Sequence, residues 1–271
     1  MVDALRNAAV TYRVLAGARL RSDLQYRLSF ALFTLGQFAI NFLDFVAILI
    51  VFSNVSSLKG WSVGEVAFLY GLGNLAFALG DVFVSAVENV QFHVKEGSFD
   101  RFLLRPASPL VQVIADQFSL RRVGKLAEGL LIFTFGCGAA SIDWTLPRAA
   151  MTAVALLCGA VIFSSLWIFT SCLCFWWVDA REAANAVTYG GGFLAQYPLA
   201  VYGDVLRRVL AFGVPVAFAN YFPAVYVLGR TDRLGAPTWI QFATPAVAAI
   251  AALAAGAMWR TGVRHYRSTG S

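Results

Sequence analysis

Polar and ionisable side chains recur at helical spacing within two apolar runs of this chain. They are Asn41 and Asp44 in the first run, and Asn74, Asp81, Ser85 and Glu88 in the second. Residues three, four or seven positions apart share one face of a helix, so each set would form a polar stripe. An ionisable group exposed to lipid is costly, which means that these side chains are expected to face protein or water.

Several roles fit such a stripe. It could line a hydrated path for an amphipathic or cationic substrate, through Asn41, Asp44, Asn74, Asp81 and Ser85. It could instead supply interhelical hydrogen bonds that fix packing, the role favoured for Asn41, Asn74 and Ser85, whereas Asp81 lies deepest and fits either role equally. Glu88 is expected near the inner interface, simply solvated. A proton-coupled carrier using Asp81 and Glu88 is an alternative, although the inverted repeat typical of such carriers is not visible.

Other chemistry is excluded by missing motifs. Gly124-Lys125 is followed by Leu126, where a phosphate-binding P-loop requires Ser or Thr, so the chain is not expected to hydrolyse ATP alone. No HExxH motif occurs. The four cysteines lie within apolar runs without metal-ligand spacing, so neither a metal site nor a cofactor of its own is predicted.

The elements that carry the stripe follow from composition. The chain is 59% hydrophobic and 13% charged, with a mean hydropathy of +0.69, which predicts an all-α polytopic membrane protein. A membrane helix needs roughly 20 apolar residues. Six spans are predicted, at residues 28–52, 66–90, 126–140 (extended upstream), 149–178, 183–201 and 239–259. We expect residues 1–271 to form a single transmembrane domain, with no nucleic-acid partner.

Two segments flank these spans in unusual ways. Residues 1–27 combine five arginines with apolar residues at three- and four-residue spacing, which predicts an amphipathic helix on the membrane surface, in contact with lipids. Residues 205–228 are apolar but contain Pro215 and Pro223, which predicts a broken, re-entrant hairpin on the outer side. With six spans, fifteen Lys and Arg residues fall inside and six outside, so both termini are expected in the cytoplasm.

The segment between the second and third spans is basic and amphipathic. Residues 97–110 read GSFDRFLLRPASPL, in which Gly97 ends the second helix and Pro106 and Pro109 stop a new short one. This short helix is predicted to lie along the inner membrane surface. Its apolar residues are Phe99, Phe102, Leu103 and Leu104, and its basic residues are Arg101 and Arg105. A helix resting on anionic headgroups would have the same composition.

Taken in order, these features resemble the permeases of type 2 ABC transporters, most closely their small single-domain bacterial branch. That branch carries a Gly-x-x-Asp-x-x-Leu-x-Arg-Pro pattern after its second span, matched here by Gly97, Asp100, Leu103, Arg105 and Pro106. The stretch at residues 215–230 resembles the outer hairpin of the same branch. The resemblance covers essentially the whole chain.

The resemblance implies half of an exporter. Two six-span subunits, more often related than identical chains, would form the path, and two ATPase subunits carrying ATP and Mg²⁺ would bind beneath them. Phe99, Phe102, Leu103 and Leu104 would fill a cleft on the ATPase, with Asp100, Arg101, Arg105 and Pro106 completing the contact. The branch exports drugs and toxic compounds from the bacterial plasma or inner membrane, so an amphipathic substrate is expected. A membrane scaffold without transport activity would also lack catalytic motifs, but it would not explain the amphipathic helix predicted in residues 97–110.

Overall fold

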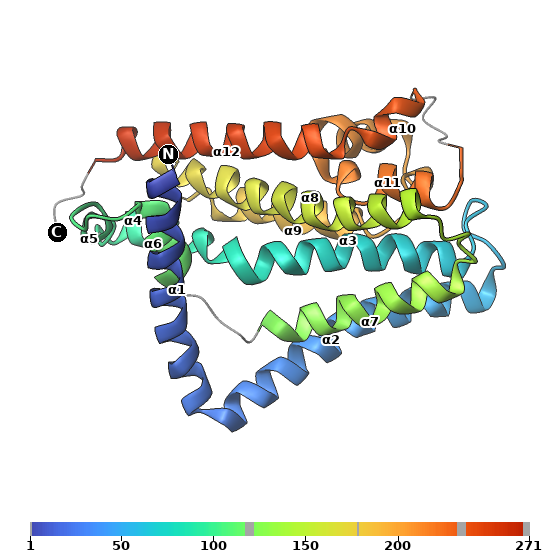
Figure 1. Cartoon of the computed structure of the whole chain (residues 1–271), viewed down its shortest axis with the longest axis horizontal. Helices are drawn as coiled ribbons and strands as arrows, with labels where there is room; N and C mark the ends of the chain where they lie inside the picture. The colour runs from blue at the N-terminus through green and yellow to red at the C-terminus, as the bar shows by residue number, and fades with distance from the viewer. Residues whose placement is uncertain (1, 117–121, 178, 232–236, 268–271) are drawn as a thin grey trace.

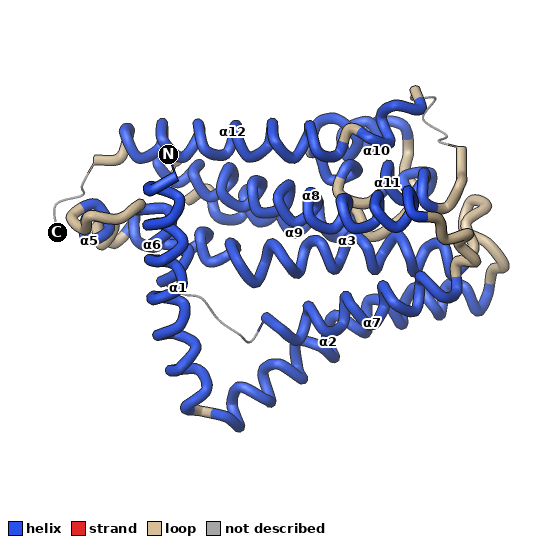
Figure 2. The backbone as a smooth tube through the Cα atoms, viewed as in Figure 1, coloured by secondary structure: helices blue, strands red, loops and turns tan. Residues whose placement is uncertain are grey.

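Every element that the structure describes is helical. The computed structural model describes residues 2–116, 122–177, 179–231 and 237–267, and within these ranges it contains no strand beyond one isolated bridge between Leu58 and Trp61. Figure 2 shows the long helices running side by side, with loops gathered at the two ends of the bundle. The predicted all-α class is confirmed for this part of the chain.

Six long helices form the bundle, and a seventh crosses it. The crossing helix, α1 (Val2–Gln25), lies at one end, across the direction of the others (Figure 1). The bundle helices are α2 (Arg27–Asn54), α3 (Val63–Val84), α7 (Val123–Ala139), α8 (Leu146–Ser171), α9 (Arg181–Leu194) and α12 (Thr244–His265). The start of α1 and the end of α12 lie at the same end of the bundle (Figure 1).

Length and apolar composition identify four helices that could cross a membrane. They are Arg27–Asn54, Val63–Lys95, Leu146–Phe175 and Thr244–His265. The second and third include short extensions: η1 (Ser85–Asn89) and α4 (Val90–Lys95) follow α3, and η3 (Cys172–Phe175) follows α8. At 17 and 14 residues, α7 and α9 fall short of the roughly 20 residues that span a bilayer. Six spans therefore stay a prediction.

The predicted hairpin is a bent pair of short helical segments. It consists of α10 (Asp204–Arg208) with η5 (Val209–Gly213), and of η6 (Pro215–Phe218) with α11 (Tyr221–Val227). The two halves meet at an angle of 68°. Counted as one unit the pair is apolar enough for a fifth span, and the re-entrant hairpin stays a prediction. The 3₁₀ helices η4 (Leu199–Val201) and η7 (Thr238–Phe242) flank it.

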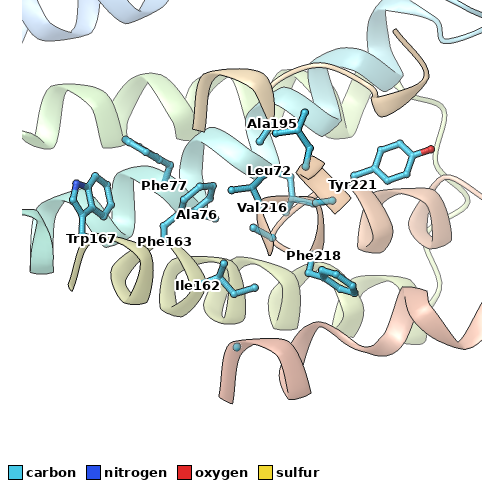
Figure 3. Packing of buried hydrophobic residues seen from close by; sticks show 14 of the residues in the cluster. Leu72, Ala76, Phe77, Ile162, Phe163, Trp167, Ala195, Val216, Phe218 and Tyr221 are labelled. Carbon is cyan, nitrogen blue, oxygen red and sulfur yellow. The ribbon is translucent and has the colours of Figure 1, made fainter. Parts of the chain in front are cut away.

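The helix at the centre is α3. Within its most apolar window 89% of residues are buried, compared with 11% in α2 and 22% in α12. It packs along both α7 and α8. Figure 3 shows Leu72, Ala76 and Phe77 of α3 against Ile162 and Phe163 of α8, with Val216 and Phe218 of the bent pair nearby. The core therefore forms around α3.

Glycines allow the backbones of α3 and α7 to come into direct contact. A Cβ at Gly71 would lie 2.5 Å from the Cα of Phe133, and one at Gly136 would lie 2.4 Å from the backbone nitrogen of Phe68. Small residues at such crossings are typical of helix pairs in membranes, where close packing replaces the hydrophobic effect. This contact sets how side chains of α7 meet those of α3.

The crossing helix is tied to the bundle at the base of α3. It packs on α6 (Pro109–Asp116), and the Tyr12 hydroxyl donates to the backbone oxygen of Phe83 at 3.3 Å. Burial raises the pKa of Tyr12 to about 12, so this hydroxyl stays protonated as a donor. The predicted helix in residues 1–27 is thus present, and it supports the end of α3.

At the opposite end, Glu65 holds the start of α3. Ser62 and Glu65 form a capping box, in which the Glu65 carboxylate accepts from the Ser62 backbone nitrogen at 2.8 Å. The same carboxylate pairs with Arg230 at 2.5 Å, and the guanidinium stacks 4.6 Å from the centroid of the Trp61 ring. Arg230 follows α11, so Glu65 joins α3 to the bent pair.

We expect Glu65→Gln to lower the free energy of unfolding by about 1 kcal/mol, because it removes the ion pair and weakens the cap. The measurement is thermal unfolding of the purified protein in detergent. Glu182→Gln, which neutralises an exposed carboxylate in the first turn of α9, is the matched control. Equal changes in the two variants would show that Glu65 is not a tie between α3 and the bent pair.

Candidate functional site

Arg122 lies at a break in α3. The α-helix ends at Val84 and continues as the 3₁₀ segment η1, where the Ser85 hydroxyl donates to the backbone oxygen of Asp81 at 2.6 Å. The Arg122 guanidinium donates to the same oxygen at 3.3 Å and also to the Ser85 hydroxyl. Arg122 therefore satisfies backbone and side-chain acceptors that the break exposes.

The same guanidinium bridges two carboxylates. Its Nε lies 3.5 Å from Asp81 Oδ1, and its Nη2 lies 3.7 Å from Glu88 Oε1. The three side chains are 24%, 12% and 22% exposed, so the cluster is largely but not completely enclosed. Tyr189 of α9 donates from its hydroxyl to Glu88 at 3.0 Å, which brings a third long helix into the contact.

A second polar layer lies one turn along α7. Glu128 is fully buried and accepts a hydrogen bond from the Asn74 side chain at 2.6 Å. The Lys125 ammonium lies 3.8 Å from the centroid of the Phe77 ring, an attractive cation–π arrangement. Asp44 of α2 lies close enough to act electrostatically on both side chains, with opposite charge to Lys125 and like charge to Glu128.

Three aromatic rings complete the surroundings of these charges. Phe77, Trp167 and Tyr189 form a cluster, with ring centroids 4.7 Å apart for Phe77 and Trp167, and 5.9 Å apart for Trp167 and Tyr189. Figure 3 shows the first two rings side by side. The site thus combines carboxylates, two basic side chains and aromatic faces.

The stripe predicted from the sequence lies in this site with one exception. Asn74, Asp81, Ser85 and Glu88 of α3 and η1 all take part, and Asp44 faces the second layer. Asn41 instead donates to the Gln37 backbone oxygen in its own helix. The hydrogen bond from Asn74 to Glu128 fits the packing role. Asp81 and Glu88, which a proton relay would need, both contact Arg122.

Sequence reasoning did not place the basic residues in this site. Arg122 and Lys125 precede the third predicted span at residues 126–140, on the side predicted to be cytoplasmic, and Glu128 lies near the same end of that span. The signal was their spacing, since Arg122, Lys125 and Glu128 recur every three residues and so share one face of α7. What could not be deduced is that α7 packs this face on the polar stripe of α3.

The segment at residues 97–110 differs from its predicted form. It holds a four-residue helix, α5 (Asp100–Leu103), followed by bends at Pro106. Pro109 does not stop a helix but starts α6. The Gln112 side chain donates to the backbone oxygens of Phe102 and Ala107, at 3.0 and 2.9 Å, which fixes the turn between the two helices.

Its apolar residues divide between the interior and the surface. Phe99 and Phe102 are buried, and Phe99 packs against Phe175, Trp259 and Tyr266 at the ends of η3 and α12. The expectation that both rings fill a cleft on a partner is therefore at odds with their packing. Leu104 is 86% exposed and Leu103 41% exposed.

The two arginines of this segment are exposed. Arg101 contacts Asp116 at 3.5 Å and stacks 4.8 Å from the Phe102 centroid, while Arg105 is exposed. Asp100 opens α5. Leu103, Leu104 and Arg105 thus form the outward surface of the segment, which we call the loop surface.

Comparison with known sequences agrees with this architecture of apolar helices. Residues 38–270 match the family described as "ABC-2 family transporter protein". Curated proteins and solved structures gave no match. The family match extends from the middle of α2 to beyond the end of α12 and includes both the polar site and the loop surface. The chain therefore belongs to the ABC-2 transporter family, as a membrane permease of an ABC transporter.

Proposed function

We propose that this permease is one half of an ATP-driven exporter of amphipathic compounds. A separate ABC ATPase supplies ATP and Mg²⁺, and a second six-span permease completes the path. Both termini lie in the cytoplasm of a bacterial cell. The start of α1 and the end of α12, which lie at the same end of the bundle as α5, support this orientation (Figure 1).

The observation that carries the proposal is the exposure of Leu104. Leu104 is 86% exposed beside the exposed Leu103 and Arg105, in a turn fixed by Gln112, so the three side chains are available to a cleft on a partner. The helix α5 lies at the end of the bundle, where a cytoplasmic subunit would have access to it (Figure 1). We therefore assign the ATPase contact to Leu103, Leu104 and Arg105.

The polar site between α3 and α7 supports the path. Its side chains come from α2, α3, α7 and α9, and it holds partly exposed carboxylates inside an otherwise apolar bundle. Because ionisable groups in a membrane are kept where they face protein or water, the site fits the wall of a translocation path.

The test is co-purification of the ATPase with the tagged permease from its native host in mild detergent, with partner chains identified by mass spectrometry. Leu103→Glu with Leu104→Glu is expected to reduce the recovered ATPase at least about tenfold, because a carboxylate would have to enter an apolar cleft. The matched control is Leu146→Glu, since Leu146 is 85% exposed at the opposite end of the bundle.

Monodisperse elution of both variants would show that the fold is intact. If wild-type protein brought down no ATPase, or if the double variant kept it in full, the assignment of the loop surface would be wrong. Recovery of a second permease chain together with the ATPase would identify a heterodimer.

A further inference from the structure

We propose that the polar site binds an organic cation, and that Arg122 and Lys125 occupy it when no substrate is present. This inference rests on the proposed function and assigns its substrate class. The two basic side chains then pair with the carboxylates of the site until a cationic substrate displaces them.

The argument begins with the charges of the site. Four carboxylates meet here: Asp81 and Glu88 at Arg122, and Asp44 and Glu128 at Lys125. Three basic side chains interact with them: Arg122 and Lys125, and Arg181 of α9, which interacts with Glu88. With all groups ionised, the acidic residues outnumber the basic ones by one. A cation entering the site would therefore lower the repulsion among the carboxylates that the basic side chains do not cancel.

The aromatic rings indicate that the cation is organic. Lys125 already uses the face of Phe77 as a cation site, with its ammonium 3.8 Å from the ring centroid. Carboxylates together with aromatic faces are the groups that recognise quaternary and other organic cations, since the rings also bind their apolar bodies. A small hydrated metal ion would gain nothing from Phe77, Trp167 and Tyr189.

A further observation concerns Trp167. Its side chain is 1% exposed, and its indole nitrogen has no hydrogen-bond partner among the described residues, although a buried N–H usually has one. It belongs to the same aromatic cluster as Phe77 and Tyr189. A ligand with an acceptor atom next to its cationic centre would satisfy this donor.

Displacement would break two long ion pairs of Arg122, together with its hydrogen bonds to the Asp81 backbone oxygen and the Ser85 hydroxyl. The Arg122 nitrogens lie 3.5 and 3.7 Å from the two carboxylate oxygens, longer than the 2.7–2.9 Å of a strong charge-assisted hydrogen bond. Tyr189 is 38% exposed, so the cluster is reached from the side of α9. Substrate binding would free Arg122 from Asp81 and Ser85, and with it the break in α3.

The experiment measures binding of radiolabelled tetraphenylphosphonium to the full-length permease in nanodiscs by equilibrium dialysis. Arg122→Gln removes a competing cation and leaves both carboxylates, so it is expected to tighten binding about tenfold. Lys125→Gln is expected to change binding in the same direction. Adding Asp81→Asn and Glu88→Gln to Arg122→Gln should remove the gain.

Three controls separate this effect from others. Arg122→Lys keeps a cation and should bind as the wild type does, and Arg148→Gln changes a matched arginine that pairs with Asp143 on α8's outer side. Neutral triphenylphosphine oxide should bind equally to all variants. A folded Arg122→Gln or Lys125→Gln variant that binds no more tightly than wild type would overturn the proposal. The assay contains no ATPase, so its failure is distinguishable from failure of the proposed function.

Discussion

Replacing Gly136 by alanine is expected to lower the free energy of unfolding by about 3 kcal/mol, the upper range for overpacking of a core. The new Cβ would lie 2.4 and 2.5 Å from the backbone nitrogen and Cα of Phe68. These are backbone atoms of α3, which cannot rotate away as a side chain can, so α3 and α7 would have to separate. The change is measured by thermal unfolding in detergent, in which the loss of monodisperse protein is the recorded signal.

The control lies two residues along the same helix. Gly138 is exposed and nothing lies within 4 Å of the position of its Cβ, so Gly138→Ala is expected to stabilise α7 by about 0.5–1 kcal/mol through lower backbone entropy in the unfolded chain. The same chemical change thus has opposite signs at the two positions. A similar effect at both would mean that α3 and α7 do not touch at Gly136.

Replacing Phe99 by alanine is expected to leave the ATPase bound and active, but to reduce the ATP-driven conformational change about tenfold, within the range of coupling energies between distant sites. Phe99 connects the loop surface to the ends of η3 and α12 through Phe175, Trp259 and Tyr266, at centroid distances of 5.6, 6.3 and 5.0 Å. Without this ring, movement of the loop no longer displaces those helices.

The readout is the distance between spin labels at Val55 and Val201, measured with and without ATP. Both residues are exposed, at 42% and 37%; Val55 follows α2 and Val201 is the last residue of η4. Phe99→Leu preserves much of the packing and should retain the change, while Leu104→Ala should weaken ATPase binding instead. If Phe99→Ala released the ATPase, Phe99 would belong to the docking surface, as its sequence position suggests.

The helices were predictable because their apolar character is continuous. The first predicted span, at residues 28–52, differs from α2 by only a few residues, since both of its ends carry polar residues. The fifth, at residues 183–201, extends well past the end of α9 at Leu194. There Pro198 removes a backbone donor, and an apolar run alone does not show where the helix gives way to a turn.

The partners of buried charges could not be deduced in the same way. Periodicity placed Asp81 and Glu88 on one face of their helix, but it carries no information on which helix covers that face. Arg122 lies next to an apolar run. From the sequence alone, its guanidinium could contact water as well as a carboxylate. Only the close contact between α3 and α7, which glycines permit, brings the two sets together.

The orientation of Phe99 and Phe102 shows the same limit at the cytoplasmic loop. A short segment with four apolar residues predicts an apolar surface, but not which of these residues are buried inside the protein and which are exposed. The aromatic residues at the ends of η3 and α12 lie more than seventy positions away in the sequence. Their packing on Phe99 is a tertiary contact that a local pattern cannot contain.

The burial of α3 has a consequence for how the bilayer acts on this protein. Most of the apolar windows of α2 and α12 are uncovered and so available to lipid or to another chain, whereas α3 is surrounded almost entirely by its own protein. Its apolar sequence therefore reflects helix packing and not contact with acyl chains. Changes in lipid composition reach the break at Ser85 only through the helices that surround it.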